Sequence, residues 1–386
     1  MPAVDYEGAD SVNNRSVIRF LVAGMVALIV ATPAFADIKA YNAAITSGDV
    51  KQAAVEAKGV WATWNQARPD TALIAREFGY ITYVAGDFAA TRDFGLFLQT
   101  KGPTLATPDD QPAVSAVVLA AANFRLKADG RTRSELFKVL QQRQATPNID
   151  RLSMLAAEAL YVHDLDKGEY RNTAESAEIA FDLISRDRGA LTVRSLNARS
   201  ISAISRFVSK RGRNDFFPIA DAHDAIIDAL NVTSDPAQRD DLIDLKFFLQ
   251  AWAHSAEAYL YAAGQISAVS AQRFESRELK TPDHAIFPIS TSADIRCDMD
   301  FEKNTLKYPR SAAFQGLVGT VIVKMDVNHE GRITQSQVLA SVPAEGFAES
   351  VMKFLDTARF VRTKDAEPGC MMFAPAMIYT FSFNIE

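Results

Sequence analysis

The last part of the chain carries the pattern that most restricts its fold. From Gly319 to Val327 apolar and polar residues alternate strictly, as they do in a β-strand with one face toward a core. Residues 328–331, Asn-His-Glu-Gly, supply a turn, so residues 332–340 should return as an antiparallel partner. The expected buried face holds Val321, Val323, Met325 and Val327, and the other, expected to be mostly in water, holds Thr320, Ile322, Lys324 and Asp326.

A helix and a closing strand follow this hairpin. Apolar residues recur at helical spacing from Phe347 to Ala358, which predicts a helix that covers the sheet. In the last strand, Tyr379, Phe381, Phe383 and Ile385 should face one side and Thr380, Ser382 and Asn384 the other. With a short helix between Asn304 and Gly316, the order is αββαβ, with a three-stranded antiparallel sheet.

The region between residues 37 and 279 reads as helices in pairs. Glycines beside polar residues recur about every 40 residues, a period typical of stacked helical hairpins; they are Gly48, Gly86, Gly130, Gly168 and Gly212. Apolar residues between them follow a helical period, and we expect five or so antiparallel pairs. Around Gly79, Tyr83 and Gly86-Asp87-Phe88 the sequence resembles the tetratricopeptide repeat. That resemblance implies a peptide-binding concave face, although a purely architectural spacer is an equal alternative.

The N-terminus has the features of a secretory signal peptide. Arg15 and Arg19 precede the apolar run 20–31, and Ala34-Phe35-Ala36 offers a cleavage site, so residues 1–36 should be removed on export. An uncleaved membrane anchor is the alternative, but the run is shorter than the roughly 20 residues that span a bilayer. We therefore expect a periplasmic protein. The net charge of -6 argues against a nucleic-acid surface.

Export also gives the two cysteines a meaning. In an oxidising compartment an even number of cysteines favours a disulfide, here between Cys297 and Cys370. The bridge would close a loop of about 74 residues and, in the chain-entropy treatment, stabilise the fold by roughly 4 kcal/mol. Two unrelated thiols are the alternative.

Residues 294–386 resemble the C-terminal domain of the TonB family, and residues 280–293 would be a linker before it. The matching positions are Tyr308-Pro309, Ala312, Gly316, Gly319, Val321, Val323, Val327, Gly331, Val338, the 341–346 loop, Phe347, Phe360 and the closing 381–385 segment. In that family the last strand pairs with an extended segment of an outer-membrane transporter. The resemblance implies the same for this chain, because an unpaired strand edge offers backbone donors and acceptors to an added strand.

The partner-binding residues that this resemblance implies lie on the last strand and at the start of the domain. They are Ala376, Ile378, Tyr379, Thr380, Phe381, Ser382, Phe383, Tyr308 and Pro309, with Pro375 limiting pairing at the start of the strand. Alternatively, a second copy of the domain, giving a homodimer, or the preceding helices cover this edge. Contact with inner-membrane motor subunits has less support, because the apolar run 20–31 carries no ionisable residue to couple to a proton-driven motor.

No enzyme or cofactor signature is present in the sequence. The five histidines are scattered without an i, i+4 pair for a metal, and no nucleophile elbow, phosphate loop or dinucleotide fingerprint occurs. His163 and His223 fall in helical segments, and the carboxylates Asp221, Asp224 and Asp228 follow one helical face as a solvated stripe. We expect a non-enzyme without cofactor or metal. We expect it to bind an envelope protein, in transport or, alternatively, as a scaffold of the cell envelope.

Overall fold

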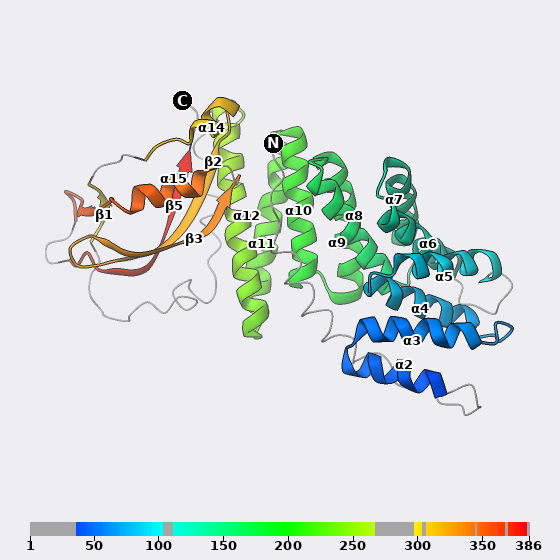
Figure 1. Ribbon diagram of the computed structural model, residues 1–386. Helices are drawn as coiled ribbons and strands as arrows, with labels where there is room; N and C mark the ends of the chain where they lie inside the picture. Colours follow the sequence, from blue (N-terminus) through cyan, green and yellow to red (C-terminus); the bar gives the residue numbers. More distant parts are fainter. Residues whose placement is uncertain are drawn as a thin grey trace. The chain divides into compact units, whose positions relative to one another are not determined.

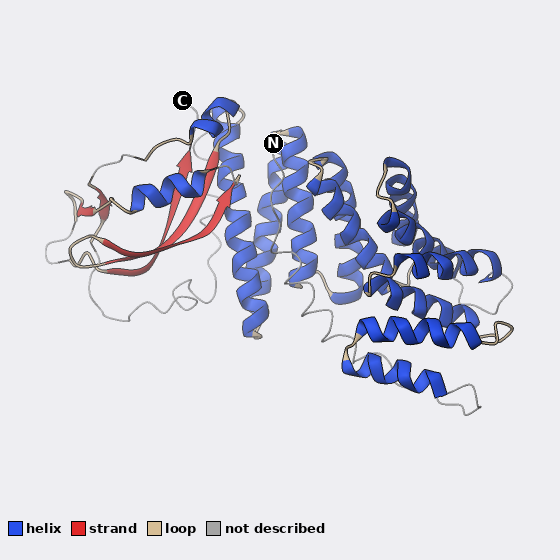
Figure 2. Ribbon diagram, in the orientation of Figure 1, coloured by secondary structure: helices blue, strands red, loops and turns tan. Residues whose placement is uncertain are grey.

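The computed structural model describes residues 36–102, 111–266, 297–302, 306–343, 346–366 and 370–383. In these ranges the chain is α+β: eleven helices precede a three-stranded antiparallel sheet, two short helices and a two-stranded sheet (Figures 1 and 2). This confirms the expected fold class. Residues 1–35 of the expected signal peptide, the expected linker, and Asn384 and Ile385 lie outside the described residues.

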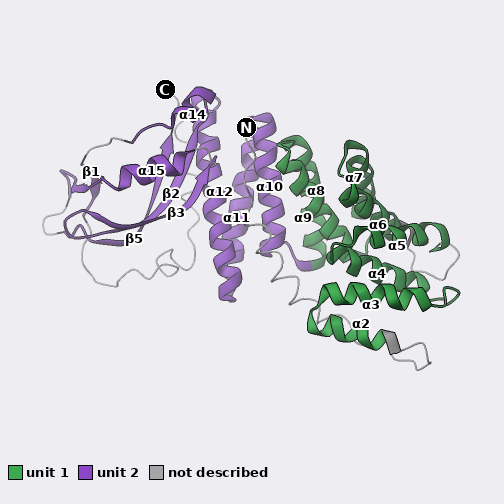
Figure 3. Ribbon diagram, in the orientation of Figure 1, with its two compact units in different colours: residues 1–187 green, residues 188–386 purple. Residues whose placement is uncertain are grey.

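The chain forms two compact units, residues 1–187 and residues 188–386 (Figure 3). The helices from residue 193 onward therefore group with the sheet, whereas the sequence-based division placed them with the preceding helices. The first unit contains α2 Ala36–Ser47, α3 Val50–Thr63, α4 Thr71–Val84, α5 Phe88–Lys101, α6 Gln111–Leu126, α7 Gly130–Gln144, α8 Arg151–Asp166 and α9 Tyr170–Arg188.

The glycine-aspartate turns explain why the helices of the first unit form hairpins. Gly86 has a φ of 83°, a left-handed conformation that glycine adopts without a steric penalty. Asp87 then caps α5, because its carboxylate accepts the backbone N–H of Ala90 at 3.1 Å. Gly48 and Asp49 repeat the arrangement between α2 and α3. The recurring glycines thus mark the turn inside each pair.

A buried ion pair ties three helices of this unit together. The guanidinium of Arg133 on α7 donates two hydrogen bonds of 2.9 Å to the carboxylate of Asp164 on α8. The hydroxyl of Ser176 on α9 donates to the same carboxylate at 3.0 Å. Asp164 is fully buried, and the bidentate geometry supplies the hydrogen bonds that a buried charge needs.

The second unit combines three helices with the sheet. Its helices are α10 Val193–Lys210, α11 Arg213–Val232 and α12 Pro236–Ala262, followed by the short α14 Arg310–Gln315 and α15 Phe347–Leu355. Its strands are β1 Met299–Phe301, β2 Gly319–Val327, β3 Ile333–Val342, β4 Phe360–Arg362 and β5 Ala374–Phe383. The three long strands pair antiparallel in the order β3-β2-β5, and β1 pairs antiparallel with β4.

Each face of the sheet packs against a different helix. Val321 and its three alternating neighbours on β2 form a core with Phe347, Val351 and Phe354 of α15, as expected. The expectation that the opposite face would be mostly in water is wrong. Thr320 and Ile322 are fully buried, because α12 covers this face and joins Ile322 to the core of the three long helices.

Candidate partner-binding edge

Strand β5 is the element on which most of the expected partner-binding residues meet. Tyr379, Phe381 and Phe383 point into the core shared with α15, so their rings anchor the strand. Ile378, on the opposite face, packs against the core of α12. Of the expected residues on β5, Ser382 alone is exposed, and Thr380 lies opposite Ile322 in register. The side chains therefore hold β5 in the sheet and leave its backbone edge as the recognition element.

The outer edge of β5 is unpaired within the described residues. Among the strands of this part of the chain, β5 pairs with β2 and with no other. From Met377 to Phe383 it follows β2 in a one-to-one register without a bulge, and this stretch carries no charged residue and no proline. Such a regular, uncharged edge can accept another strand.

The start of β5 is irregular, as the proline there led us to expect. The register with β2 shifts between Met325 and Val327, where Pro375 and Ala376 oppose one residue. Ala376 has a φ of 53°, and its N–H donates to a carboxylate oxygen of Asp326 at 2.7 Å. A bulge of this kind ends regular pairing, so the usable edge begins at Met377.

The other edge strand, β3, is less suited to accept a partner. Its register with β2 shifts twice, between Ile322 and Val323 and between Asp326 and Val327, so it has two bulges. At its end, the backbone oxygen of Val342 accepts a hydrogen bond of 3.4 Å from Ser255 of α12. Bulges interrupt the backbone pattern that a new strand needs, and α12 contacts the end of β3.

Tyr308 supports the end of β5 from the neighbouring loop, and Pro309 is the next residue in the chain. The ring of Tyr308 packs against Phe383, with ring centroids 5.6 Å apart, and against Phe347, and its hydroxyl donates to the backbone oxygen of Leu317. Burial raises the pKa of Tyr308. Pro309 precedes the first residue of α14. The structure thus brings Tyr308 to Phe383 at the end of β5, whereas Pro309 caps the N-terminus of α14.

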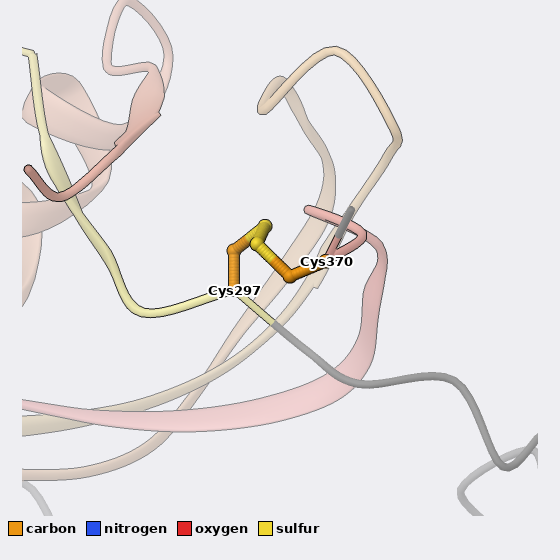
Figure 4. Close-up of a disulfide and its surroundings, with 2 residues drawn as sticks. All are labelled: Cys297 and Cys370. Atoms are coloured by element: carbon orange, nitrogen blue, oxygen red, sulfur yellow. A yellow bond between two sulfur atoms is a disulfide. The ribbon is translucent and has the colours of Figure 1, made fainter. Parts of the chain in front are cut away.

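The expected disulfide is present and fixes the start of β1 beside the segment before β5 (Figure 4). Cys297 and Cys370 are joined across a sequence separation of 73 residues, and the N–H of Cys297 donates to the backbone oxygen of Met371 at 3.0 Å. The ring of Phe301 then packs against Tyr379 and Phe381 at centroid distances of 5.3 and 5.8 Å. Strand β1 is therefore part of the surroundings of β5.

Three acidic residues on and around β1 were not among the residues expected from the sequence to form the site. Asp298, Asp300 and Glu302 are exposed and alternate with Cys297, Met299 and Phe301, which are buried or half-buried. This alternation was readable in the sequence, but β1 is too short to stand out as a strand. Burial, and then the nearby charge of Asp300, raise the pKa of Tyr379 on β5.

One comparison with known proteins identifies the C-terminal part of the chain. Residues 304–369 match the family model described as the Gram-negative bacterial TonB protein C-terminal region. This part of the chain is similar to the TonB C-terminal domain. The match ends before β5 and does not extend to the helices α2–α12, so the resemblance to tetratricopeptide repeats stays a prediction. No curated protein and no solved structure matches the chain.

The described residues hold neither a metal-binding group nor a membrane-spanning helix. They contain no group of three or more His, Cys, Asp or Glu side chains arranged to hold a metal ion. Among them, no helix combines the length and the apolar character needed to cross a bilayer. His163 and His223 lie in α8 and α11, as expected for helix residues, and burial lowers the pKa of His163.

Proposed function

We propose that this protein works in the periplasm and binds an extended segment of an outer-membrane transporter by adding it as a strand to β5. The TonB C-terminal domain belongs to a family that acts in envelope transport, which supports a partner of this class. The observation that carries the proposal is the regular, unpaired edge from Met377 to Phe383. The mode of binding relies on backbone hydrogen bonds and needs no catalytic group or cofactor.

The packing of the second unit favours β5 over β3 as the binding edge. Two bulges interrupt β3, and α12 contacts its end through Ser255. In contrast, α15 and α12 approach β5 through its side chains on the two faces of the sheet. These contacts leave its outer backbone edge unpaired among the described residues, so a partner strand can extend the order to β3-β2-β5-partner.

Photo-crosslinking in cells tests the proposal. A photoreactive amino acid at Ser382, which is exposed on β5, should form an adduct with an outer-membrane transporter, identified by mass spectrometry. The matched control is Gln337, which is exposed on β3 and should give no such adduct. Adducts from Gln337 but not from Ser382 would refute the choice of edge.

The alternative, an envelope scaffold without a role in transport, uses the same edge with different partners. The same experiment separates the two, because a scaffold would yield adducts with other envelope proteins at Ser382. A deletion strain adds a second criterion: loss of uptake of a transported nutrient supports the transport function. A damaged envelope with normal uptake supports the scaffold. Inner-membrane motor subunits and a second copy of the chain are further adducts that this experiment would reveal.

A further inference from the structure

The region around β1 presents an acidic face, and this region packs beside β5. Asp298, Asp300 and Glu302 are exposed and alternate with residues that point toward the protein, so the three carboxylates share one side of the extended segment. Backbone hydrogen bonds hold the segment in this conformation. The backbone oxygen of Asp298 accepts a hydrogen bond from the backbone N–H of Thr363 at 2.9 Å, and the backbone N–H of Glu302 donates to the backbone oxygen of Arg359 at 2.8 Å.

The position of this acidic face relative to β5 is fixed from two directions. At one end, the disulfide from Cys297 to Cys370 and the hydrogen bond from Cys297 to Met371 join the segment to the chain that leads into β5. At the other end, the ring of Phe301 packs on the rings of Tyr379 and Phe381. Asp300 is close enough to Tyr379 for its negative charge to add to the rise in the pKa of that tyrosine that burial causes.

These three carboxylates form no ion pair with another described residue. Asp300 accepts the backbone N–H of Phe301 at 2.8 Å, which leaves its charge in place. Arg359 directs its guanidinium Nε to the backbone oxygen of Glu330. Arg362 lies opposite Met299 in register. Residues directly opposite each other in an antiparallel pair point to the same face, so the side chain of Arg362 leaves the backbone on the face of Met299, away from the three carboxylates. A row of acidic side chains without an ion-pair partner among the described residues therefore lies beside β5.

We propose that the segment accepted by β5 carries basic side chains on the face turned toward β1. Successive side chains of an added strand point to opposite faces of the sheet, so every second one would lie on the side of Asp298, Asp300 and Glu302. Lysine or arginine at those positions would compensate the acidic row, whereas acidic residues there would be repelled. This inference rests on the proposed function and adds the chemistry of the recognised segment.

The size of the expected effect follows from the exposure of the groups. Exposed ion pairs are individually weak, but several pairs in one row should together change affinity by about tenfold. The effect should weaken as salt is added, because exposed charges are screened. Affinity that does not depend on charge would come from the backbone hydrogen bonds of the edge.

Two short synthetic peptides of equal length provide the test, one alternating threonine with lysine and the other threonine with glutamate. Binding to the full, oxidised chain is measured by fluorescence anisotropy at low and high salt. The lysine peptide should bind about tenfold more tightly than the glutamate peptide at low salt. A photoreactive residue at Ser382 should crosslink it, and one at Gln337 should not.

Two variants with the same net charge separate this surface from general electrostatics. The variant Asp298→Asn, Asp300→Asn, Glu302→Gln should lose the preference for the lysine peptide. The control Asp240→Asn, Asp241→Asn, Asp244→Asn removes three exposed carboxylates from α12 and should keep it. Unfolding midpoints in urea verify that both variants fold.

Three outcomes would overturn the inference: equal binding of both peptides, a preference that survives in the first variant, or crosslinking at Gln337 in place of Ser382. Failure of the proposed function is seen separately, as the absence of a transporter adduct from Ser382 in cells. A transporter adduct together with equal peptide binding would retain the proposed function and reject the charge preference.

Discussion

Gly331 shows how one missing side chain lets two parts of the C-terminal unit meet. It closes the β2–β3 turn with a φ of 77°, and its backbone oxygen accepts the N–H of Phe360 at 2.8 Å. A Cβ atom added here would overlap the backbone oxygen of Phe360. Glycine is required twice over, by the left-handed conformation and by the close approach of β4.

The substitution Gly331→Ala should therefore lower the free energy of unfolding by at least about 2 kcal/mol, since both the backbone conformation and the contact become strained. Urea unfolding followed by circular dichroism measures the change. Gly130→Ala is the matched control, because Gly130 begins α7 and an added Cβ meets nothing within 4 Å. Equal stability of Gly331→Ala and the parent protein would contradict this account.

At the scale of elements, α12 is the helix that decides how the sheet is buried. One side of it packs with α10 and α11, and another contacts β2, β3 and Ile378 of β5 in the same continuous core. Within this core the hydroxyl of Ser255 donates to the hydroxyl of Thr320 at 3.0 Å, and both side chains are buried. This polar pair fixes the position of α12 on the strand.

A double-mutant cycle on this pair tests the contact. Ser255→Ala should cost about 1 to 2 kcal/mol of unfolding free energy, because it leaves a buried hydroxyl without its partner. Ser255→Ala combined with Thr320→Val should cost less than the sum of the two single changes, since neither polar group then remains buried. Ser209→Ala, at an exposed hydroxyl on α10, should have little effect. Additive costs in the cycle would show that the two hydroxyls do not interact.

The position of α12 also explains why the burial of the second face of β2 was not predicted from the sequence. Alternation along β2 correctly grouped Val321 with Val323 and Thr320 with Ile322, because it depends on local geometry. It could not show that α12, far away in sequence, covers the second group. Turns and caps such as Gly86-Asp87 were predictable for the same local reason.

The candidate site was predictable to a similar extent. The last strand and its inward aromatic residues followed from alternation and from the family resemblance, and the disulfide followed from the cysteine count. The bulges of β3 and the short pairing of β1 with β4 depend on contacts between distant segments, so no local pattern announced them. The acidic row could have been noticed as a pattern, but its place beside β5 could not.

At the scale of the whole molecule, the two hydrophobic cores of the second unit determine which fragments of the chain can fold alone. A fragment that begins at residue 297 keeps the core under α15 but exposes Ile322, Ala340, Val342 and Ile378, which α12 covers in the full chain. We expect this fragment to bind a hydrophobic dye, to self-associate in gel filtration, and to unfold at lower urea than the fragment 188–386. Equal midpoints and a monomeric short fragment would show that α12 is dispensable.

The attachment of β2 to α12 has a mechanical consequence for anything that grips β5. A pull on an added strand would load the ladder between β5 and β2, and β2 is anchored on the flank of the longest described helix. The force would pass to α12 through contacts such as that of Ser255 with Thr320, and so to a helix instead of a flexible linker. The packing of β2 on α12 within the second unit therefore sets the direction of pull that the complex withstands best.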